Sequence, residues 1–178
     1  MNLELVIDFE ITPELVKLYA ESTHCPFVGE KDGPYCEIRA GFELEKIARS
    51  KKYANFERLG IMKIFWEGKL VGFSLPRVIL EREHEIFKLP PDCTYYRVGT
   101  VYIGHEHRGK GIMMWVIKKF VSIYSNVVWT CDEKNIASQK SAVRGGLKFS
   151  HLIYFRSRDD WSFEPIEDYT RLSHVYSN

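Results

Sequence analysis

Residues 95–113 read YYRVGTVYIGHEHRGKGIM, in which an aromatic and β-branched run is followed by a glycine-rich segment. The run at 95–103 is typical of a strand, and the segment at 104–111 predicts a loop that opens a helix. Glycine lets backbone N–H groups approach a ligand closely, and the first turn of a helix favours negative charge. Together with Arg108 and Lys110, the stretch predicts a cradle for a diphosphate.

Two other interpretations of this loop stay open. The glycines could simply make a tight turn between strand and helix. Residues 104–110 also match G-x-x-x-x-G-K, and the apolar run at 127–132 ends in an acid, as in a nucleotide triphosphatase. However, Gly111 stands where that motif needs a Ser or Thr hydroxyl for magnesium, and too little chain follows to wind a parallel sheet.

The periodicity along the rest of the chain predicts a mixed α/β (α+β) fold in the order β-α-α-β-β-β-α-β-α-β-β. No internal repeat or low-complexity segment interrupts it. The predicted elements are a strand at 3–9, a helix that starts at Thr12-Pro13-Glu14, a loop at 24–35, a helix at 37–50, hairpin strands at 60–66 and 69–79, a charged connection at 81–91 with one helical turn, a strand at 95–103, a helix at 112–124, a strand at 127–131 buried on both faces, a helix at 135–144, and strands at 147–156 and 169–175.

Length and composition favour one globular domain over residues 1–178. The net charge of +1 offers no global field for nucleic acid or an anionic membrane. The N-terminus lacks a basic region, and no apolar run reaches the ~18 residues that span a bilayer. The four cysteines form no C-x-x-C pair, which predicts free thiols, no metal site and a cytoplasmic, reducing environment.

Two motifs resemble the GNAT superfamily of N-acetyltransferases. The segment R108-G-K-G111 resembles the family's R/Q-x-x-G-x-G/A loop, which wraps the pyrophosphate of coenzyme A. Residues 135–149 (NIASQKSAVRGGLKF) resemble its second motif, N-x-x-S/A followed by a helix and G-F, with Leu147 in the usual Phe place. The motif resemblance covers 94–149, and the remaining chain agrees in pattern.

The resemblance implies a splayed central sheet and a set of residues that bind acetyl-CoA, the co-substrate. Backbone groups of one strand would hold the pantetheine arm, the loop and helix start would hold the pyrophosphate, and two residues would line the far side of the arm. For Asn135, a plain helix cap is the alternative. The strand residues are Val101, Tyr102 and Ile103. The residues of the loop and helix start are Arg108, Gly109, Lys110, Gly111, Ile112 and Met113, and those on the far side of the arm are Asn135 and Ser138.

The sequence departs from the family pattern at several positions. Met113 replaces a small residue at the end of the loop, and Ala142 stands where many members have a tyrosine that protonates the leaving thiolate. That role would be vacant or pass to Ser141, Tyr154 or water. Thr130 and Cys131 occupy the region where some members carry a glutamate.

The reaction that the resemblance implies is direct attack of an amine on the thioester. An amine with a pKa near about 10.4 must first lose its proton, so a base or a desolvating pocket is needed. Candidate bases are Glu106, His105 and His107, with a solvated surface trio and proton transfer through a water relay as the alternatives. His84, in the charged connection, is predicted to be solvated. A strand N–H near Tyr102 and Ile103 would stabilise the oxyanion.

Five acids and no basic residue between 159 and 168 predict a rim that attracts a cationic acceptor, such as a small amine, a lysine or a peptide N-terminus. Trp161 and Phe163 in the same segment favour a recognition surface. The alternative is an ordinary solvated hairpin tip. A coenzyme A-binding module without catalysis is the competing function. The five acids are Asp159, Asp160, Glu164, Glu167 and Asp168.

Overall fold

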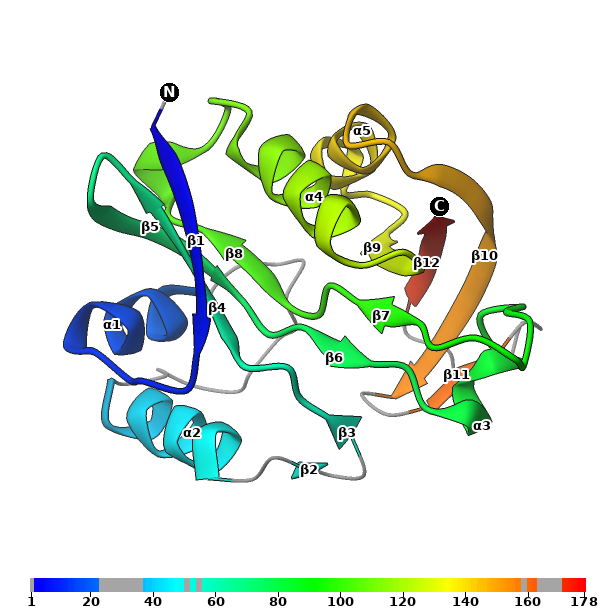
Figure 1. Ribbon diagram of the computed structural model, residues 1–178, viewed down its shortest axis with the longest axis horizontal. Helices are drawn as coiled ribbons and strands as arrows, with labels where there is room; N and C mark the ends of the chain where they lie inside the picture. Colours follow the sequence, from blue (N-terminus) through cyan, green and yellow to red (C-terminus); the bar gives the residue numbers. More distant parts are fainter. Residues whose placement is uncertain (1, 23–36, 50–51, 54–55, 158–159, 163–170) are drawn as a thin grey trace. The chain divides into compact units, whose positions relative to one another are not determined.

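The computed structural model of the protein describes residues 2–22, 37–49, 52–53, 56–157, 160–162 and 171–178. The chain divides into two compact units, each built from two segments (Figure 1). The first unit comprises Met1–Val78 with Val98–Ile112, and the second comprises Ile79–Arg97 with Met113–Asn178. The single domain inferred from length stays a prediction.

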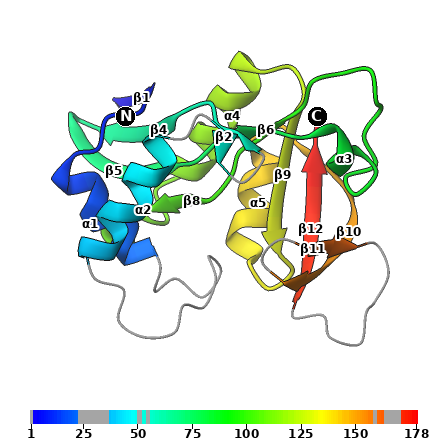
Figure 2. The same ribbon diagram turned by 90° about the horizontal axis from the view of Figure 1, so that it is seen from below.

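The first unit is built on an antiparallel sheet in the order β1-β4-β5-β8, which leaves β8 at an edge. Figure 2 shows helices α1 and α2 in this unit. Its elements are β1 (Leu3–Asp8), α1 (Pro13–Ser22), α2 (Glu37–Arg49), β2 (Lys52–Tyr53), β3 (Phe56–Glu57), β4 (Ile61–Trp66), β5 (Lys69–Ser74), β6 (Arg77–Val78), β8 (Val101–Ile103) and the 3-10 turn η1 (His105–His107).

Both helices pack on one face of this sheet. Helix α1 begins as the sequence predicts, with Pro13 first and the Thr12 hydroxyl accepting the N–H of Leu15 at 3.3 Å. Helix α1 contacts β5, β8 and α2. The apolar residues that these elements share form one buried cluster: Leu15, Tyr19, Ala20, Ala40, Leu44, Ile47, Ile61, Phe73, Leu75 and Tyr102.

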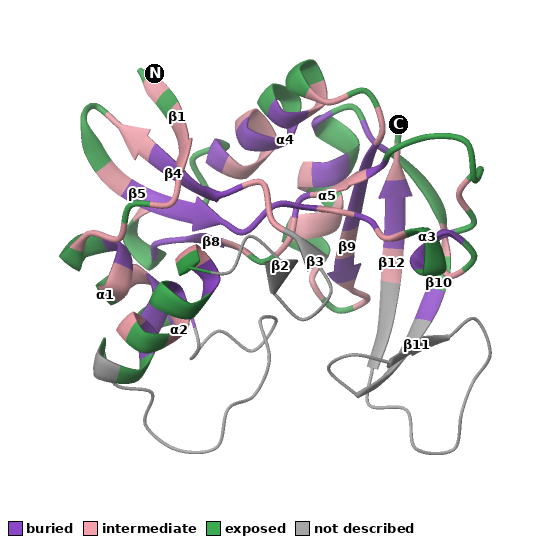
Figure 3. Ribbon diagram, turned by 60° about the horizontal axis from the view of Figure 1, so that its bottom comes forward, coloured by how far each residue is buried: buried purple, intermediate pink, exposed green. Residues whose placement is uncertain are grey.

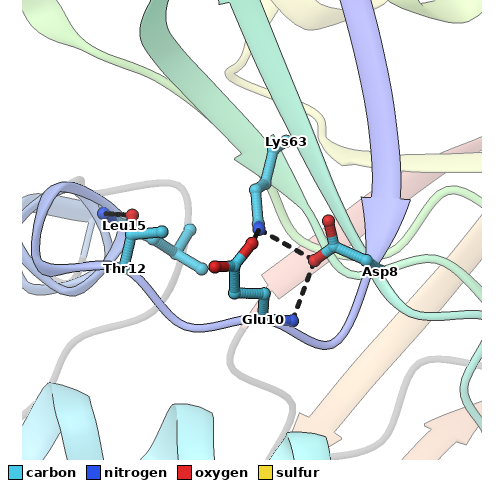
Figure 4. A network of polar contacts seen from close by, with 5 residues as sticks. All are labelled: Asp8, Glu10, Thr12, Leu15 and Lys63. Atoms are coloured by element: carbon cyan, nitrogen blue, oxygen red, sulfur yellow. Dashed lines mark hydrogen bonds and ion pairs between the residues drawn. The ribbon is translucent and has the colours of Figure 1, made fainter.

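A buried cation also links β1 to β4. The side chain of Lys63 is only 3% exposed, and its ammonium lies 2.8 Å from Asp8 and 3.5 Å from Glu10 (Figure 4). The same Asp8 carboxylate accepts the N–H of Glu10 at 2.8 Å. Because a buried ammonium needs opposite charge close by, the two acids account for its place in the sheet.

The second unit contains a sheet in which β11, β10, β12, β9 and β7 are successive neighbours. All of these pairings are antiparallel except that of β7 with β9, which is parallel. Its elements are α3 (Glu81–His84), β7 (Tyr96–Arg97), α4 (Ile112–Ile123, which starts at the boundary), β9 (Val127–Asp132), α5 (Ile136–Arg144), β10 (Lys148–Ser157), β11 (Asp160–Ser162) and β12 (Arg171–Ser177).

Strand β9 is an interior strand of this sheet, between β12 and β7. Val127, Val128, Trp129 and Cys131 are all buried (Figure 3), so burial on both faces, as predicted, is confirmed. On one face Val128 packs in an apolar cluster with Ile79, Phe87, Tyr95, Ile153 and Val175. Helix α5 contacts β9, β10 and β12.

The mixed α/β class is confirmed, but the predicted strand at 95–103 is wrong as a single element. It is divided into β7, which pairs with β9, and β8, which pairs with β5. Gly99 lies between them, where an added Cβ would come within 2.1 Å of the Leu75 carbonyl oxygen. This close backbone approach marks the point where the chain passes from one sheet to another.

Smaller differences have similar causes. The second hairpin strand ends at Ser74 instead of continuing to 79, since Pro76 has no N–H to give to a ladder. The short strands β2, β3 and β11 have no counterpart in the prediction, and β6 lies within the predicted strand at 69–79. The single helical turn expected in 81–91 is found as α3. The splay of the central sheet stays a prediction.

Candidate functional site

The loop after β8 has the backbone geometry of a ligand cradle. Residues 105–107 form η1, and then Gly109 and Gly111 adopt φ values of 75° and 78°. This left-handed region favours glycine, so the two glycines are required by the turn itself. Helix α4 begins immediately afterwards, at Ile112.

Three consecutive N–H groups of this loop are available to a ligand. In the part of the chain that the structure describes, no protein hydrogen bond uses the N–H of Gly109, Lys110 or Gly111. The first N–H groups of an α-helix likewise have no partner within the helix. Backbone N–H groups in a turn of this kind, followed by the positive end of a helix dipole, form a site suited to an anion.

Arg108 lies within the loop but is held against β8. Its Nε donates a 3.0 Å hydrogen bond to the carbonyl oxygen of Ile103, and its Cζ lies 5.0 Å from the ring centroid of Tyr102. The residue is nevertheless exposed. Arg108 therefore shapes the turn as well as adding positive charge to it.

Lys110, between the two glycines, contacts the hairpin of β4 and β5. Its ammonium lies 4.7 Å from the centroid of the Trp66 ring, and His107 meets the same indole edge-on at 5.8 Å. Trp66 thus contacts the loop at both His107 and Lys110. Its position in an ordinary strand did not predict this role. The local signal available was only an aromatic residue beside a two-residue turn.

Glu106, one of the two candidate catalytic residues, lies in solvent. Its side chain is 72% exposed and pairs with His107 at 3.0 Å and with Lys69 at 3.6 Å. His105 is exposed as well. The exposure of Glu106 and His105 agrees with the alternative of a solvated surface and gives no support to Glu106 as a desolvated base. The His107 side chain is only 15% exposed and does not fit that alternative.

Strand β8 offers part of its backbone to a ligand because it is an edge strand. Bonds from Gly104 N to Val71 O and from Leu75 N to Thr100 O fix its register with β5. By antiparallel alternation, Tyr102 faces β5, and the N–H groups of Val101 and Ile103 point to the open edge. The register therefore favours Ile103 over Tyr102 as an oxyanion donor.

This pairing also removes the nucleotide triphosphatase interpretation. In that class the strand before the phosphate loop belongs to a parallel sheet. Here β8 lies in an antiparallel sheet, next to β5. Two separate observations, the sheet direction and Gly111 in place of a hydroxyl, thus exclude it.

Asn135 and Ser138 have structural partners in the second unit. The Asn135 side chain accepts the N–H of Ser138 at 3.1 Å and so caps helix α5. The Ser138 hydroxyl accepts the indole N–H of Trp129 at 3.1 Å. The helix-cap interpretation of Asn135 is confirmed, and a contact with coenzyme A stays a prediction.

Ser141, the other candidate catalytic residue, uses its proton within its own helix. Its hydroxyl donates to the carbonyl oxygen of Ala137 at 2.8 Å. The neighbouring Ala142 is fully buried, so the position where the family has a tyrosine faces the interior of this unit. Ser141 would have to break its bond before it could protonate a thiolate.

The residues that replace the family's glutamate are also engaged. The Thr130 hydroxyl accepts a 2.7 Å hydrogen bond from the Arg97 guanidinium. Burial raises the pKa of the Cys131 thiol to about 11, although hydrogen bonds with Ser138 and Trp129 act in the opposite direction. A thiol of this kind stays protonated at neutral pH, so Cys131 is a poor base or nucleophile there.

Some predicted positions are placed differently or cannot be placed. His84 is only 8% exposed and meets Tyr95 edge-on at 5.3 Å, so the prediction of a solvated side chain is wrong. His84 lies in the one-turn helix α3 and is buried in the second unit. Its charged neighbours in the sequence gave no sign of this burial.

Of the acidic segment, Asp159, Glu164, Glu167 and Asp168 lie outside the described residues, as does loop 24–35. Among the described residues, no group of three His, Cys, Asp or Glu side chains is placed to hold a metal.

Comparisons with known proteins identify the fold. No protein-family model matches the chain, and no curated protein sequence matches it. Among solved structures, it resembles the acetyltransferase from Salmonella typhimurium that modifies the N-terminal serine of ribosomal protein L7/L12, with TM-score 0.66 and 14% identity over 99% of this chain and 94% of that one.

Two further structures agree. One is the microcin C7 self-immunity acetyltransferase MccE in complex with acetyl-CoA and AMP, with TM-score 0.66, 16% identity and coverage of 99% and 91%. The other is a GNAT superfamily phosphinothricin acetyltransferase from Sinorhizobium meliloti in complex with acetyl-CoA, with TM-score 0.61, 14% identity and coverage of 100% and 88%. The chain therefore has the fold of the GNAT N-acetyltransferases.

Proposed function

We propose that this protein is an acyltransferase that moves an acetyl group from acetyl-CoA to an amine by direct attack. The observation that carries this proposal is the cradle after β8, in which Gly109 and Gly111 are left-handed and the N–H groups of residues 109–111 have no protein partner just before α4. Its support is the fold, shared with acetyltransferases crystallised with acetyl-CoA. Because one fold can host many activities, the cradle is stronger support for this function than the fold is.

Each part of acetyl-CoA would have its own binding residues. In the first unit, residues 108–112 and the positive end of α4 would bind the diphosphate. The pantetheine arm would bind along the open edge of β8, as an additional strand would. Met113 begins the second unit and is half-buried. In that unit, Asn135 and Ser138 would contribute in addition to their structural bonds. Each set can be tested separately.

The reaction must stabilise an oxyanion, release a thiolate and remove a proton from the amine. The oxyanion of the tetrahedral intermediate would accept the N–H of Ile103. The thiol of the leaving group has a moderate pKa of about 8.5, so the thiolate needs little help from an acid. Proton removal from the amine would go through water, because Glu106 and His105 are both exposed to solvent.

The second candidate function is a coenzyme A-binding module without catalysis. It is favoured by one observation, that neither candidate catalytic side chain is free and desolvated. The two functions differ only in turnover. A protein that binds acetyl-CoA but releases no thiol with a broad panel of amines would belong to the second class.

The experiment is a side-by-side thermal-shift titration with acetyl-CoA, coenzyme A and ATP, followed by a thiol-release assay with the amine panel. Ligand that binds the native state raises the melting temperature according to its concentration over Kd. We expect shifts with both coenzyme A ligands and none with ATP. A shift with ATP alone would overturn the proposal.

For the acceptor, we propose a cationic amine, with a peptide N-terminus as one class. The support is the acidic segment between 159 and 168 and the neighbour that modifies an N-terminal serine. The acceptor KM should rise with salt, because exposed charges are screened over about 8–10 Å. Changing several of these acids to Asn or Gln should raise the acceptor KM and reduce its salt dependence. An anionic best acceptor would contradict this.

The proposed compartment is the cytoplasm. Its support is that Cys93 and Cys131, the cysteines within the described residues, are free thiols. None of the helices in the described ranges is both long and apolar enough to cross a bilayer.

A further inference from the structure

Glu21, in the last turn of α1, is bonded to both β8 and the loop through one carboxylate oxygen. Its Oε1 accepts the Tyr102 hydroxyl at 2.6 Å and the backbone N–H of His105 at 3.2 Å. Tyr102 is the middle residue of β8, and His105 is the first residue of η1. A single exposed side chain thus ties the end of a helix to the strand and the turn that lead into the cradle.

The contact extends to Arg108 through the Tyr102 ring. The guanidinium of Arg108 lies 5.0 Å from the centroid of this ring, whose hydroxyl donates to Glu21. A phenol that donates to a carboxylate has a more electron-rich ring, which strengthens its attraction for a cation. Glu21 thus contacts His105 directly and is linked to Arg108 through the Tyr102 ring.

Packing by itself does not need this carboxylate. The ring of Tyr102 belongs to the buried apolar cluster of the first unit, whereas Glu21 is exposed. Replacing Glu21 leaves the apolar contacts of the ring intact and removes the two hydrogen bonds. An exposed acid whose bonds converge on a ligand-binding turn contributes to the geometry of that turn more than to global stability.

We propose that Glu21 is a positioning residue for the diphosphate of acetyl-CoA, holding β8 and the loop in the conformation that presents the N–H groups of residues 109–111. This inference rests on the proposed function. A preformed cradle binds its anion without first losing conformational entropy, so the effect appears in binding of the diphosphate and not in the acyl-transfer step.

The test compares Glu21→Ala and Glu21→Gln with Glu14→Ala, which changes an exposed acid in the first turn of the same helix. The ligands are acetyl-CoA and acetyl-pantetheine, which lacks the diphosphate. We expect Glu21→Ala to weaken acetyl-CoA binding by about 5- to 20-fold and acetyl-pantetheine binding by less than about twofold. Glu21→Gln keeps an acceptor oxygen and should restore most of the affinity, while kcat at saturation stays within about twofold.

Amide hydrogen exchange at His105 supplies a readout that needs no ligand. Glu21→Ala should speed this exchange, and Glu14→Ala should not. If acetyl-CoA does not bind the wild type, the proposed function fails, and the exchange data still show whether Glu21 fixes the loop. Unchanged exchange, equal weakening of both ligands, or wild-type affinity in a folded Glu21→Ala protein would each overturn the positioning role.

Discussion

Arg108 donates its Nε hydrogen to the carbonyl oxygen of Ile103 at 3.0 Å, across the turn that the two residues enclose. The bond joins the last residue of β8 to the residue just before the first left-handed glycine. An arginine in this position has two effects on an anion, through its charge and through the backbone conformation that it stabilises. The two effects can be separated by substitution.

Arg108→Ala should weaken acetyl-CoA binding by about 1–3 kcal/mol, the range for a charge-assisted contact. Arg108→Lys keeps the charge but lacks the planar Nε–H and should recover only part of the loss. Isothermal titration calorimetry measures both, with Lys118→Ala, an exposed cation on α4, as the control. Equal affinity in all four proteins would remove Arg108 from the site.

Gly111→Val should weaken cofactor binding more than its effect on stability would explain. Gly111 has φ of 78°, where a residue with a Cβ is strained by about 1–2 kcal/mol. Gly146→Val is a matched control, because Gly146 is also left-handed, with φ of 103°, and has open space around it. Denaturant unfolding should show similar losses for the two variants, and calorimetry should show a loss of affinity only for Gly111→Val.

Asn135→Ala should destabilise the protein by about 0.5–2 kcal/mol through loss of the cap on α5. Asn135→Ser keeps a capping oxygen and should restore the free energy of unfolding. If Asn135 also contacts coenzyme A, the serine variant will be stable yet bind the cofactor more weakly. Wild-type affinity in the stable serine variant would show that this residue is a cap alone.

Cys131 should resist alkylation until the pH is strongly alkaline. Burial raises its pKa from 9.0 to about 11, so the reactive thiolate is scarce in the native state at about pH 8. Iodoacetamide followed by peptide mass spectrometry should modify the exposed Cys93 first. Rapid modification of Cys131 at about pH 8 would contradict its burial.

The raised pKa of Cys131 predicts how the free energy of unfolding changes with pH. Above about pH 9 the unfolded chain loses the thiol proton while the native protein keeps it. The free energy of unfolding therefore falls until the pH passes about 11. Below about 9 both states are protonated and the thiol has no effect. A Cys131→Ala variant should show a shallower decline over this window in urea unfolding.

Asp8→Asn should destabilise the first unit by about 2–3 kcal/mol, because it removes the nearer of the two acids that neutralise the buried Lys63 ammonium. Lys63→Met removes the charge and keeps an apolar stem of similar length, so it should cost less. Urea unfolding measures both, with Glu4→Gln, an exposed acid on β1, as the control. A larger loss in Lys63→Met than in Asp8→Asn would contradict this account.

The sequence by itself determined the features that depend on neighbouring residues. The start of α1 at Pro13, the cap of α5 at Asn135, the buried strand β9 and the glycine turn before α4 each follow from signals within a few positions. Caps, left-handed glycines and apolar periodicity act on the local backbone, so they can be recognised without knowing what packs against them. For the same reason the glycine turn could be predicted, while the binding of a diphosphate there stays a prediction.

Tertiary structure alone decided the relationships between distant residues. Glu21 and Tyr102 are 81 positions apart, and only the packing of α1 on β8 brings their oxygens to 2.6 Å. His84 is buried although its neighbours are charged, and one predicted strand is divided at Gly99 because Leu75 approaches its backbone. Local propensity does not specify which strands pair with one another. Burial and register are therefore set by the assembled sheets and not by composition.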